Sequence, residues 1–294
     1  MIRARFGLFP ALLSGVLTAM AEESSPPRAA RVPHEIAAPH GHTRQDPYYW
    51  LRERSDPKVI DYLKAENAYT EAVLKETETI QQTLFKEIKG RIKQDDRTVP
   101  YRWKSHQYYR RFESGEPYPL HCRKPIDSDR EEILFDVPEL AKGHSFFDLR
   151  RGSVSPDESL IAFSTDTVGR RIYTIQFKDL KTGELLPDKI EKVTGGHAWA
   201  NDNKTIFYTR QDPETLRSHR VYRHVLGSPV EDDVLVYEEK DETFSCFAYK
   251  TKSERYIVIH SGQTLTDEIR LLDADQPTAP PRLFTPRRRG LEHR

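Results

Sequence analysis

Three histidines near the N-terminus are the first residues whose type and spacing could do chemistry. His40 and His42 form a His-x-His pair, and His34 lies a short way upstream. Such a pair can bind zinc or copper, but structural zinc normally has four protein ligands. No cysteine or HExxH-type partner stands close to these histidines. We therefore predict no metal ligand among them.

A serine nucleophile of the α/β-hydrolase type would need two glycines flanking it. In the Gly-x-Ser-x-Gly elbow, these glycines permit a strained turn from strand to helix. The chain has 14 glycines, and no two of them stand four positions apart. The nearest approximation is Gly152-Ser153-Val154-Ser155, which we interpret as a loop before a repeated turn. Isolated Ser, His and Asp residues are plentiful, but sequence alone cannot assemble them into a triad, so we assign no catalytic residue.

Other candidate sites are equally weak. Gly183 and the pair Gly195-Gly196 lack the spacing of a phosphate-binding loop, so we predict no cofactor. Asp166 and Asp202 fall in predicted turns, where local hydrogen bonds explain an aspartate. The only cysteines, which we expect to be unpaired and partly buried thiols in different repeat units, are Cys122 and Cys246.

The charge balance argues against a nucleic-acid partner. Lys+Arg and Asp+Glu both total 46, which gives a formal net charge of zero. A nucleic-acid binder usually shows a basic excess or a clustered basic face. The basic cluster Arg287-Arg288-Arg289 is more simply explained as a solvated loop than as a binding patch.

Residues 1–21 have the pattern of an export signal, which predicts a periplasmic or secreted protein. Arg3 and Arg5 precede a short apolar run, Phe6 to Val16, and Ala19-Met20-Ala21 supplies a cleavage site. A disordered leader or a misplaced start codon remains the alternative. No later stretch approaches the roughly 20 apolar residues that span a bilayer, so we expect no membrane association after signal removal.

Two helices are predicted after an extended, mobile segment over residues 22–45. Ser55-Asp56-Pro57 combines an N-cap candidate with a proline at the first helical position. A second helix is expected from about Thr79 to Gly90, a plausible stop, with Ile80, Leu84 and Ile88 on one face. These helices define an N-terminal helical extension over residues 46–92.

From about Val99 the apolar period falls to two, which is typical of β-structure. We expect strands at Trp103–Phe112, Leu120–Lys124 and Ile133–Asp136, with a hairpin turn at Glu113–Glu116. A polar turn followed by an apolar strand then recurs, and aligning Ser164, Thr209 and His260 gives steps of 45 and 51 residues. Four-stranded propeller blades repeat every ~40–50 residues. The repetition favours a mainly β, partial β-propeller over residues 93–294, with a β-sandwich as the competing architecture.

The segment Asp46-Pro47-Tyr48-Tyr49-Trp50-Leu51-Arg52-Glu53, here called the entry motif, is the most distinctive stretch. It resembles the entry segment of the prolyl oligopeptidase family of serine peptidases. Pro33-His34 and His40-Gly41-His42-Thr43-Arg44 resemble the oligopeptidase B (protease II) branch, which cleaves short peptides after Arg or Lys. The resemblance implies a seven-bladed propeller, of which about four blades are expected here, and a catalytic α/β-hydrolase domain that docks against it.

The tail Pro286-Arg287-Arg288-Arg289-Gly290-Leu291-Glu292 resembles a family loop between blades. We therefore expect the catalytic domain to be absent from these residues, the chain to be a fragment or truncated product, and activity to be missing in it alone. The helical extension would then expose apolar surface that normally contacts the catalytic domain. A stand-alone propeller that binds a peptide or protein is the alternative, and complementation by a separately encoded catalytic half is a third possibility.

Overall fold

The computed structural model describes residues 25–293. Contacts divide the chain into two compact units, Met1–Lys93 and Gln94–Arg294, and each is described by itself. In the described part of the chain, no helix is long and apolar enough to cross a membrane. The predicted signal at residues 1–21 lies outside the described residues.

The first unit begins with a small hairpin. Strand β1 (Glu35–Ala37) pairs antiparallel with β2 (Thr43–Gln45), and the 3-10 turn η1 (Pro39–Gly41) connects them. The stretch that we expected to be simply extended therefore folds back on itself. A second 3-10 turn, η2 (Tyr49–Arg52), lies within the entry motif.

Two helices follow, and the predicted start of the first is confirmed. Helix α1 (Pro57–Leu74) has Pro57 in its first turn, and the Asp56 carboxylate caps it by accepting the Lys58 amide at 2.9 Å. After η3 (Lys75–Thr77) comes helix α2 (Glu78–Arg91). The prediction that Gly90 ends this helix is wrong. Gly90 stays helical, and Ile92 is the C-cap, since its amide bonds the Lys89 carbonyl at 3.2 Å.

The second unit consists of antiparallel sheets of five, seven and four strands. The first sheet, blade 1, contains β3 (Asp96–Arg97), β4 (Tyr101–Trp103), β5 (His106–Phe112), β6 (Leu120–Pro125) and β7 (Glu132–Asp136). The single strand expected over Trp103–Phe112 is wrong in one respect. Lys104 has a φ of 49° and turns the chain, so that β4 and β5 pair as a hairpin.

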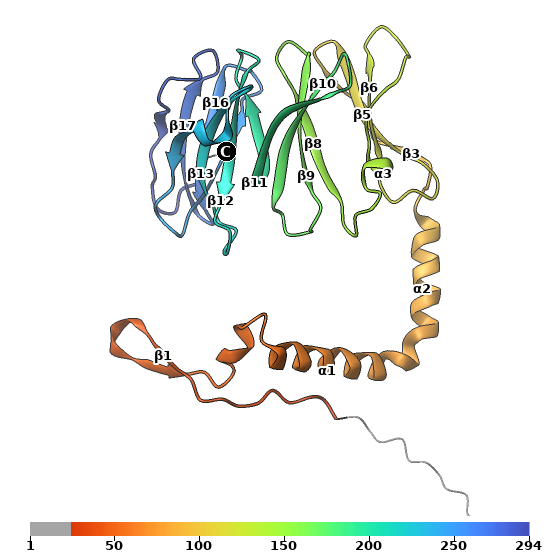
Figure 1. Ribbon diagram of the computed structural model, residues 1–294, viewed down its shortest axis with the longest axis vertical. Helices are drawn as coiled ribbons and strands as arrows, with labels where there is room; N and C mark the ends of the chain where they lie inside the picture. Colours follow the sequence, from red (N-terminus) through yellow and green to blue (C-terminus); the bar gives the residue numbers. More distant parts are fainter. Residues whose placement is uncertain (1–24, 294) are drawn as a thin grey trace, which may run out of the picture. The chain divides into compact units, whose positions relative to one another are not determined.

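The seven-stranded sheet contains two blades that share one strand. Blade 2 has β8 (Asp148–Val154), β9 (Leu160–Asp166) and β10 (Tyr173–Asp179), and blade 3 has β12 (Thr205–Gln211), β13 (Ser218–Val225) and β14 (Val234–Glu238). The shared strand β11 (Leu185–Trp199) pairs with β10 through its first part and with β12 through its last part. Figure 1 shows it running between the two blades.

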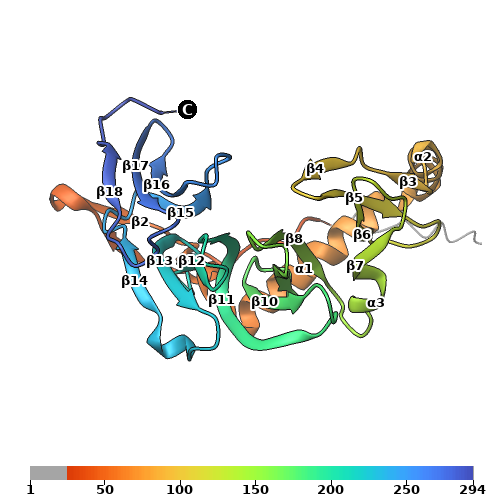
Figure 2. The same ribbon diagram turned by 90° about the horizontal axis from the view of Figure 1, so that it is seen from above.

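Blade 4 is the four-stranded sheet of β15 (Ser245–Lys250), β16 (Tyr256–Gln263), β17 (Thr266–Asp273) and β18 (Arg282–Thr285). The short helix α3 (Val137–Leu140) follows blade 1, and η4 (Val230–Asp232) precedes β14. The predicted repeat is confirmed, since its three apolar segments form the second strands β9, β12 and β16 of blades 2, 3 and 4. The fold is therefore of the β-propeller type, and in Figure 2 β4, β8 and β15 lie on the concave side of an arc of blades.

Most of the apolar core lies between neighbouring blades, and a small fourth cluster lies within blade 1. One buried cluster joins blades 1 and 2, a second joins blades 2 and 3, and a third joins blades 3 and 4. A blade that has a neighbour on each side buries side chains on both faces of its sheet. This explains the nearly continuous apolar runs in the second strands. In β12, for example, Ile206, Phe207 and Tyr208 are all completely buried.

Candidate functional site

The entry motif holds the N-terminal segment of the first unit in place. The Asp46 amide donates to the His34 carbonyl at 2.8 Å, and the Tyr49 ring stacks on the His34 ring at 3.8 Å. The indole of Trp50 donates to the Ala30 carbonyl at 2.9 Å. These contacts give the motif aromatics a structural role within this unit. His34, the first candidate metal ligand, is thus engaged as a stacking partner.

The other two candidate ligands lie at the hairpin turn of the first unit. His40 has a φ of 75° within η1, and His42 directly follows that turn. Among residues 25–293, no group of three or more His, Cys, Asp or Glu side chains is placed to hold a metal ion. The structure brings no further ligand to this pair.

Helices α1 and α2 present large apolar side chains to solvent. Only Val59 is buried in α1, and no residue of α2 is buried. Each of six apolar side chains is at least 46% exposed: Leu63, Leu74, Ile80, Leu84, Phe85 and Ile88. We call these six residues the helix face. Exposed apolar side chains that form a contiguous surface mark an interaction site or an aggregation liability.

The serine-containing segment that most nearly resembled a nucleophile elbow has a structural role. Gly152, Ser153 and Val154 belong to strand β8, so their assignment to a loop is wrong. A Cβ on Gly152 would lie 2.7 Å from the Ile161 side chain, so close strand packing requires glycine. Ser155 is fully buried and closes the following turn, with its hydroxyl accepting the Leu160 amide at 3.0 Å.

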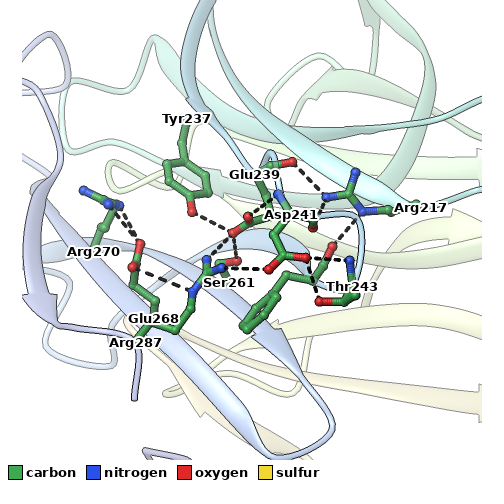
Figure 3. Close-up of polar contacts among 10 residues, drawn as sticks. Arg217, Tyr237, Glu239, Asp241, Thr243, Ser261, Glu268, Arg270 and Arg287 are labelled. Atoms are coloured by element: carbon green, nitrogen blue, oxygen red, sulfur yellow. Dashed lines mark hydrogen bonds and ion pairs between the residues drawn. The ribbon is translucent and has the colours of Figure 1, made fainter. Parts of the chain in front are cut away.

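A buried carboxylate organises a polar network that lies where blades 3 and 4 meet (Figure 3). Glu239 is only 4% exposed and directly follows β14. Its carboxylate accepts hydrogen bonds from Arg287 Nη2 at 2.6 Å and from the Tyr237 hydroxyl at 2.9 Å. The Ser261 hydroxyl and the Asp241 amide also donate to it. We call this group the Glu239 network.

Two arginines enclose the network from opposite sides. Arg217 donates to the backbone carbonyls of Phe244, Glu239 and Asp241 at 2.7, 2.8 and 2.6 Å. The Arg287 guanidinium lies 3.7 Å from the Phe244 ring centroid, a cation–π contact. The predicted solvated loop at Arg287–Arg289 is therefore wrong for Arg287, because a buried carboxylate and an aromatic face draw this one side chain inward.

The electrostatics of the network favour a permanent ion pair. Burial alone would raise the pKa of Glu239, but donors led by Ser261, the Asp241 amide and Arg287 outweigh it and hold that pKa below its usual value. The Ser261 hydroxyl donates to the Glu239 carboxylate, but Ser261 is only 1% exposed and the lowered pKa makes the carboxylate a weak base, so this pair is not arranged for covalent catalysis. The network therefore joins the loop after β14 to β16 and to the C-terminal tail rather than performing chemistry.

A second buried polar group was not predicted. His224 is fully buried in β13 between Asp233, at 2.6 Å from Nδ1, and Asp188, at 3.2 Å from Nε2. Its partners are nine and 36 positions away in sequence, so no local sequence pattern predicts these two hydrogen bonds. Although burial would lower the pKa of His224, the two carboxylates outweigh burial and raise it.

The remaining sequence candidates have the local roles expected of them. The Asp166 carboxylate accepts the amides of Val168, Gly169 and Arg171, and that of Asp202 accepts the Lys204 and Thr205 amides. Cys122 and Cys246, both in the described part of the chain, are free and buried in blades 1 and 4. Burial raises the pKa of the Cys122 thiol to about 11 and that of Cys246 to about 12, which makes both poor nucleophiles at neutral pH.

Comparison with known proteins decides the family. Residues 27–293 match the family model for "Prolyl oligopeptidase, N-terminal beta-propeller domain". The chain belongs to the prolyl oligopeptidase family. Among curated relatives, dipeptidyl aminopeptidase BI of Pseudoxanthomonas mexicana is 40% identical over 95% of this chain, and protease 2 of Moraxella lacunata is 34% identical over 90%.

Solved structures place the chain near the oligopeptidase B branch of this family. Oligopeptidase B from Leishmania major superposes with a TM-score of 0.83 at 32% identity, covering 90% of this chain and 40% of that one. Oligopeptidase B from Trypanosoma brucei gives a TM-score of 0.82 at 29% identity. The chain covers 41% and 39% of the length of the two curated relatives. It corresponds to the N-terminal propeller portion of these oligopeptidase B-like peptidases.

Proposed function

We propose that this chain is the propeller part of a serine peptidase that cleaves short peptides after Arg or Lys. The likeness to oligopeptidase B at a TM-score of 0.83 and 32% identity carries the proposal. In such a peptidase, the acyl-enzyme forms on a Ser-His-Asp triad with an oxyanion hole. The 294 residues contain no Gly-x-Ser-x-Gly elbow, so we propose that they do not hydrolyse peptides by themselves.

The apolar helix face supports a docking role within that peptidase. An unpaired surface of Leu, Ile and Phe side chains costs free energy unless another surface covers it, at roughly 25 cal/mol per Å². We propose that a catalytic α/β-hydrolase domain covers the helix face. Chemical crosslinking would test this contact: we expect crosslinks from a lysine of α2, such as Lys86 or Lys89, to the catalytic domain. If the crosslinks to that domain all came from lysines outside α1 and α2, the result would count against the proposal.

Export is the third part of the proposal. The basic start, the apolar run and the small-residue site over residues 1–21 support a periplasmic or secreted protein. N-terminal sequencing of the protein purified from its own cells should start at Glu22. A start at Met1 in cytosolic material would contradict this part alone.

The decisive experiment compares two purified proteins. One is the 294-residue chain, and the other is the product translated from the Met1 codon to the first in-frame stop codon. Both are assayed with amino-terminally blocked fluorogenic peptides that carry Arg, Lys or Ala before the reporter. We expect the translated product, if it extends beyond this chain, to cleave the Arg and Lys peptides, and the 294-residue chain to cleave none. Hydrolysis by the 294-residue chain, or equal cleavage of the Ala peptide, would contradict the proposal.

A second specificity is favoured by one observation. The relative named dipeptidyl aminopeptidase is 40% identical to this chain, whereas protease 2 is 34% identical. Removal of dipeptides requires a free amino terminus on the substrate. The same assay with free and blocked forms of one Arg peptide separates the two specificities, since only an oligopeptidase would accept the blocked form. If no product cleaves any peptide, a propeller that acts as a binding module becomes the better interpretation.

A further inference from the structure

The buried histidine of β13 joins two blades through both of its ring nitrogens. His224 is fully buried. Its Nδ1 atom lies 2.6 Å from the Asp233 carboxylate, and its Nε2 atom lies 3.2 Å from the Asp188 carboxylate. Asp188 belongs to the part of β11 that pairs with β10 in blade 2, whereas Asp233 directly precedes β14 in blade 3. The imidazole therefore spans the junction of blades 2 and 3.

A register shift in β11 presents the Asp188 carboxylate to this histidine. The pairing of β11 with β10 is irregular between Leu185 and Lys189, and such bulges change the direction of a side chain. Pro187 lies inside the irregular stretch and cannot donate a ladder hydrogen bond. The Asp188 carboxylate also accepts the Gly227 amide at 2.6 Å, which ties it to the turn after β13.

The second carboxylate is held from its other side. Asp233 accepts the Tyr208 hydroxyl at 2.6 Å through the oxygen that does not face His224. Burial, and then Asp233, raise the pKa of Tyr208, so the phenol keeps its proton and remains a donor. The Phe177 ring of β10 lies nearly parallel to the imidazole, with 6.3 Å between ring centroids, and adds no charge. The titratable groups that face the imidazole are thus Asp188 and Asp233, with Tyr208 behind Asp233.

The two contacts of the imidazole require a proton on each ring nitrogen. A neutral imidazole has one N–H donor and one acceptor nitrogen, whereas the protonated ring donates from both nitrogens. Each carboxylate also accepts a hydrogen bond from a second donor, which suits an ionised acid. Burial would lower the pKa of His224, but the two carboxylates outweigh burial and raise it. The geometry therefore fits an imidazolium between two carboxylates.

We propose that Asp188, His224 and Asp233 form a pH-sensitive clasp between blades 2 and 3, which is closed by the protonated ring and released when the ring loses a proton. The neutral ring keeps one N–H, which stays on the shorter contact with Asp233. The longer contact with Asp188 is lost, so the first part of β11 loses one of the two hydrogen bonds that tie Asp188 to blade 3. The proposal is independent of the peptidase activity.

Alkaline pH opens this clasp. The pKa of His224 is higher in the folded protein than the roughly 6.5 of an unfolded histidine. Such a group contributes stability that is fully present below the unfolded pKa and is lost as the pH rises through the folded pKa. The clasp is therefore closed in mildly acidic solution and released on the alkaline side of the folded pKa.

Nuclear magnetic resonance of the ring nitrogens tests the clasp in the unaltered 294-residue chain. The His224 signals are those absent from a His224→Gln variant, and if that variant does not fold, those that move in Asp188→Asn identify the ring. We expect two N–H groups on this ring at about pH 6 and a titration midpoint above roughly 6.5. Asp188→Asn should lower the midpoint by about one unit, a tenfold loss of proton affinity, because one of two attracting charges is gone.

A stability comparison uses a second histidine as the matched control. His197 contacts the Gly195 and Ala162 carbonyls at 3.2 and 3.1 Å, and burial lowers its pKa to about 4. This ring is uncharged between about pH 6 and about pH 9, so the stability loss in His197→Gln should not vary with pH. The loss in Asp188→Asn, followed as the shift of the urea midpoint, should shrink by at least about half over the same range.

Hydrogen exchange reports the release of the strand. In the unaltered chain, peptides that cover Leu185 to Ile190 should exchange at least about threefold faster near pH 9 than near pH 6, after correction for the intrinsic rates. Asp188→Asn should show the faster corrected exchange at both pH values, because this variant lacks the clasp throughout.

Four results would overturn the proposal. The first is a single N–H group on the His224 ring at about pH 6. The second is a titration midpoint at or below that of an unfolded histidine. The third is a stability loss in Asp188→Asn that is equal at both pH values, and the fourth is corrected exchange of the β11 peptides that does not change with pH.

Discussion

At the scale of single residues, one carboxylate has more partners than any nearby group. Glu239 accepts bonds from Arg287, Tyr237, Ser261 and the Asp241 amide. A buried charge is tolerated only when paired and hydrogen-bonded. Removing the charge would leave the Arg287 guanidinium, whose side chain is 28% exposed, without its closest anion.

We predict that Glu239→Gln lowers the free energy of unfolding by about 2–3 kcal/mol, because the network loses its negative charge and one of two acceptor oxygens is replaced by a donor. Its neighbour supplies the control. Glu238 pairs with Arg220 at 2.7 Å with both side chains more open to water, 31% and 45% exposed. Glu238→Gln should therefore destabilise the chain clearly less than Glu239→Gln, because water screens this exposed ion pair. Urea unfolding of the 294-residue chain measures both, and similar losses in the two variants would contradict the role given to Glu239.

At the scale of elements, strand β11 depends on a local backbone exception. Its register shifts between Val193 and His197, where it leaves β10 and joins β12. Gly195 lies in this shift with a φ of 80°, and a Cβ there would approach the Tyr173 ring to 2.7 Å. Only glycine combines a favourable positive φ with the absence of a Cβ that would clash with the Tyr173 ring.

Gly195→Ala should therefore destabilise the protein by about 2–4 kcal/mol through backbone strain and overpacking. The adjacent Gly196 is the matched control. It lacks a positive φ, and an added Cβ would meet nothing closer than 3.8 Å, so Gly196→Ala should change stability by less than about 1 kcal/mol. Thermal unfolding followed by circular dichroism compares them. Tolerance of Gly195→Ala would show that the strand can cross between blades in another way.

Sequence reasoning succeeded where the signal is local. The Asp56 cap, the Glu113–Glu116 turn and the repeated second strands follow from residues adjacent to each other. It failed where contacts are distant. The Lys104 turn lies inside a continuous β pattern, and Arg287 reaches a carboxylate 48 positions away. The clasp at His224 combines residues of β11, of β13 and of the segment before β14, so no single stretch of sequence could reveal it.

At the scale of the whole second unit, each blade is stabilised mainly by its contacts with the neighbouring blades. In the described residues, three of the four apolar clusters lie between two neighbouring blades, and Ile257 is fully buried in the cluster of blades 3 and 4. Repeating architectures of this kind are stabilised mainly by nearest-neighbour interfaces. Damage at one interface should therefore remain largely local.

Ile257→Ala tests this expectation. We predict a loss of about 2–5 kcal/mol at that interface, from transfer and cavity terms. Hydrogen exchange measured by mass spectrometry should accelerate in peptides of β12, β13 and β15–β17, while β5 and β6 of blade 1 keep their protection. Uniform acceleration across all blades would instead show that the unit unfolds as one cooperative body.

The shared strand β11 has a mechanical consequence. Blades 2 and 3 are joined by continuous backbone hydrogen bonding through that strand, whereas blades 1 and 2 and blades 3 and 4 meet without a common strand. Bending the arc between blades 2 and 3 would break ladder hydrogen bonds. Bending at the other two junctions would break separate contacts, such as the Glu239–Arg287 ion pair between blades 3 and 4 and the Ser105–Glu158 hydrogen bond between blades 1 and 2. The second unit therefore resists bending most strongly at the junction of blades 2 and 3, where one strand belongs to both blades.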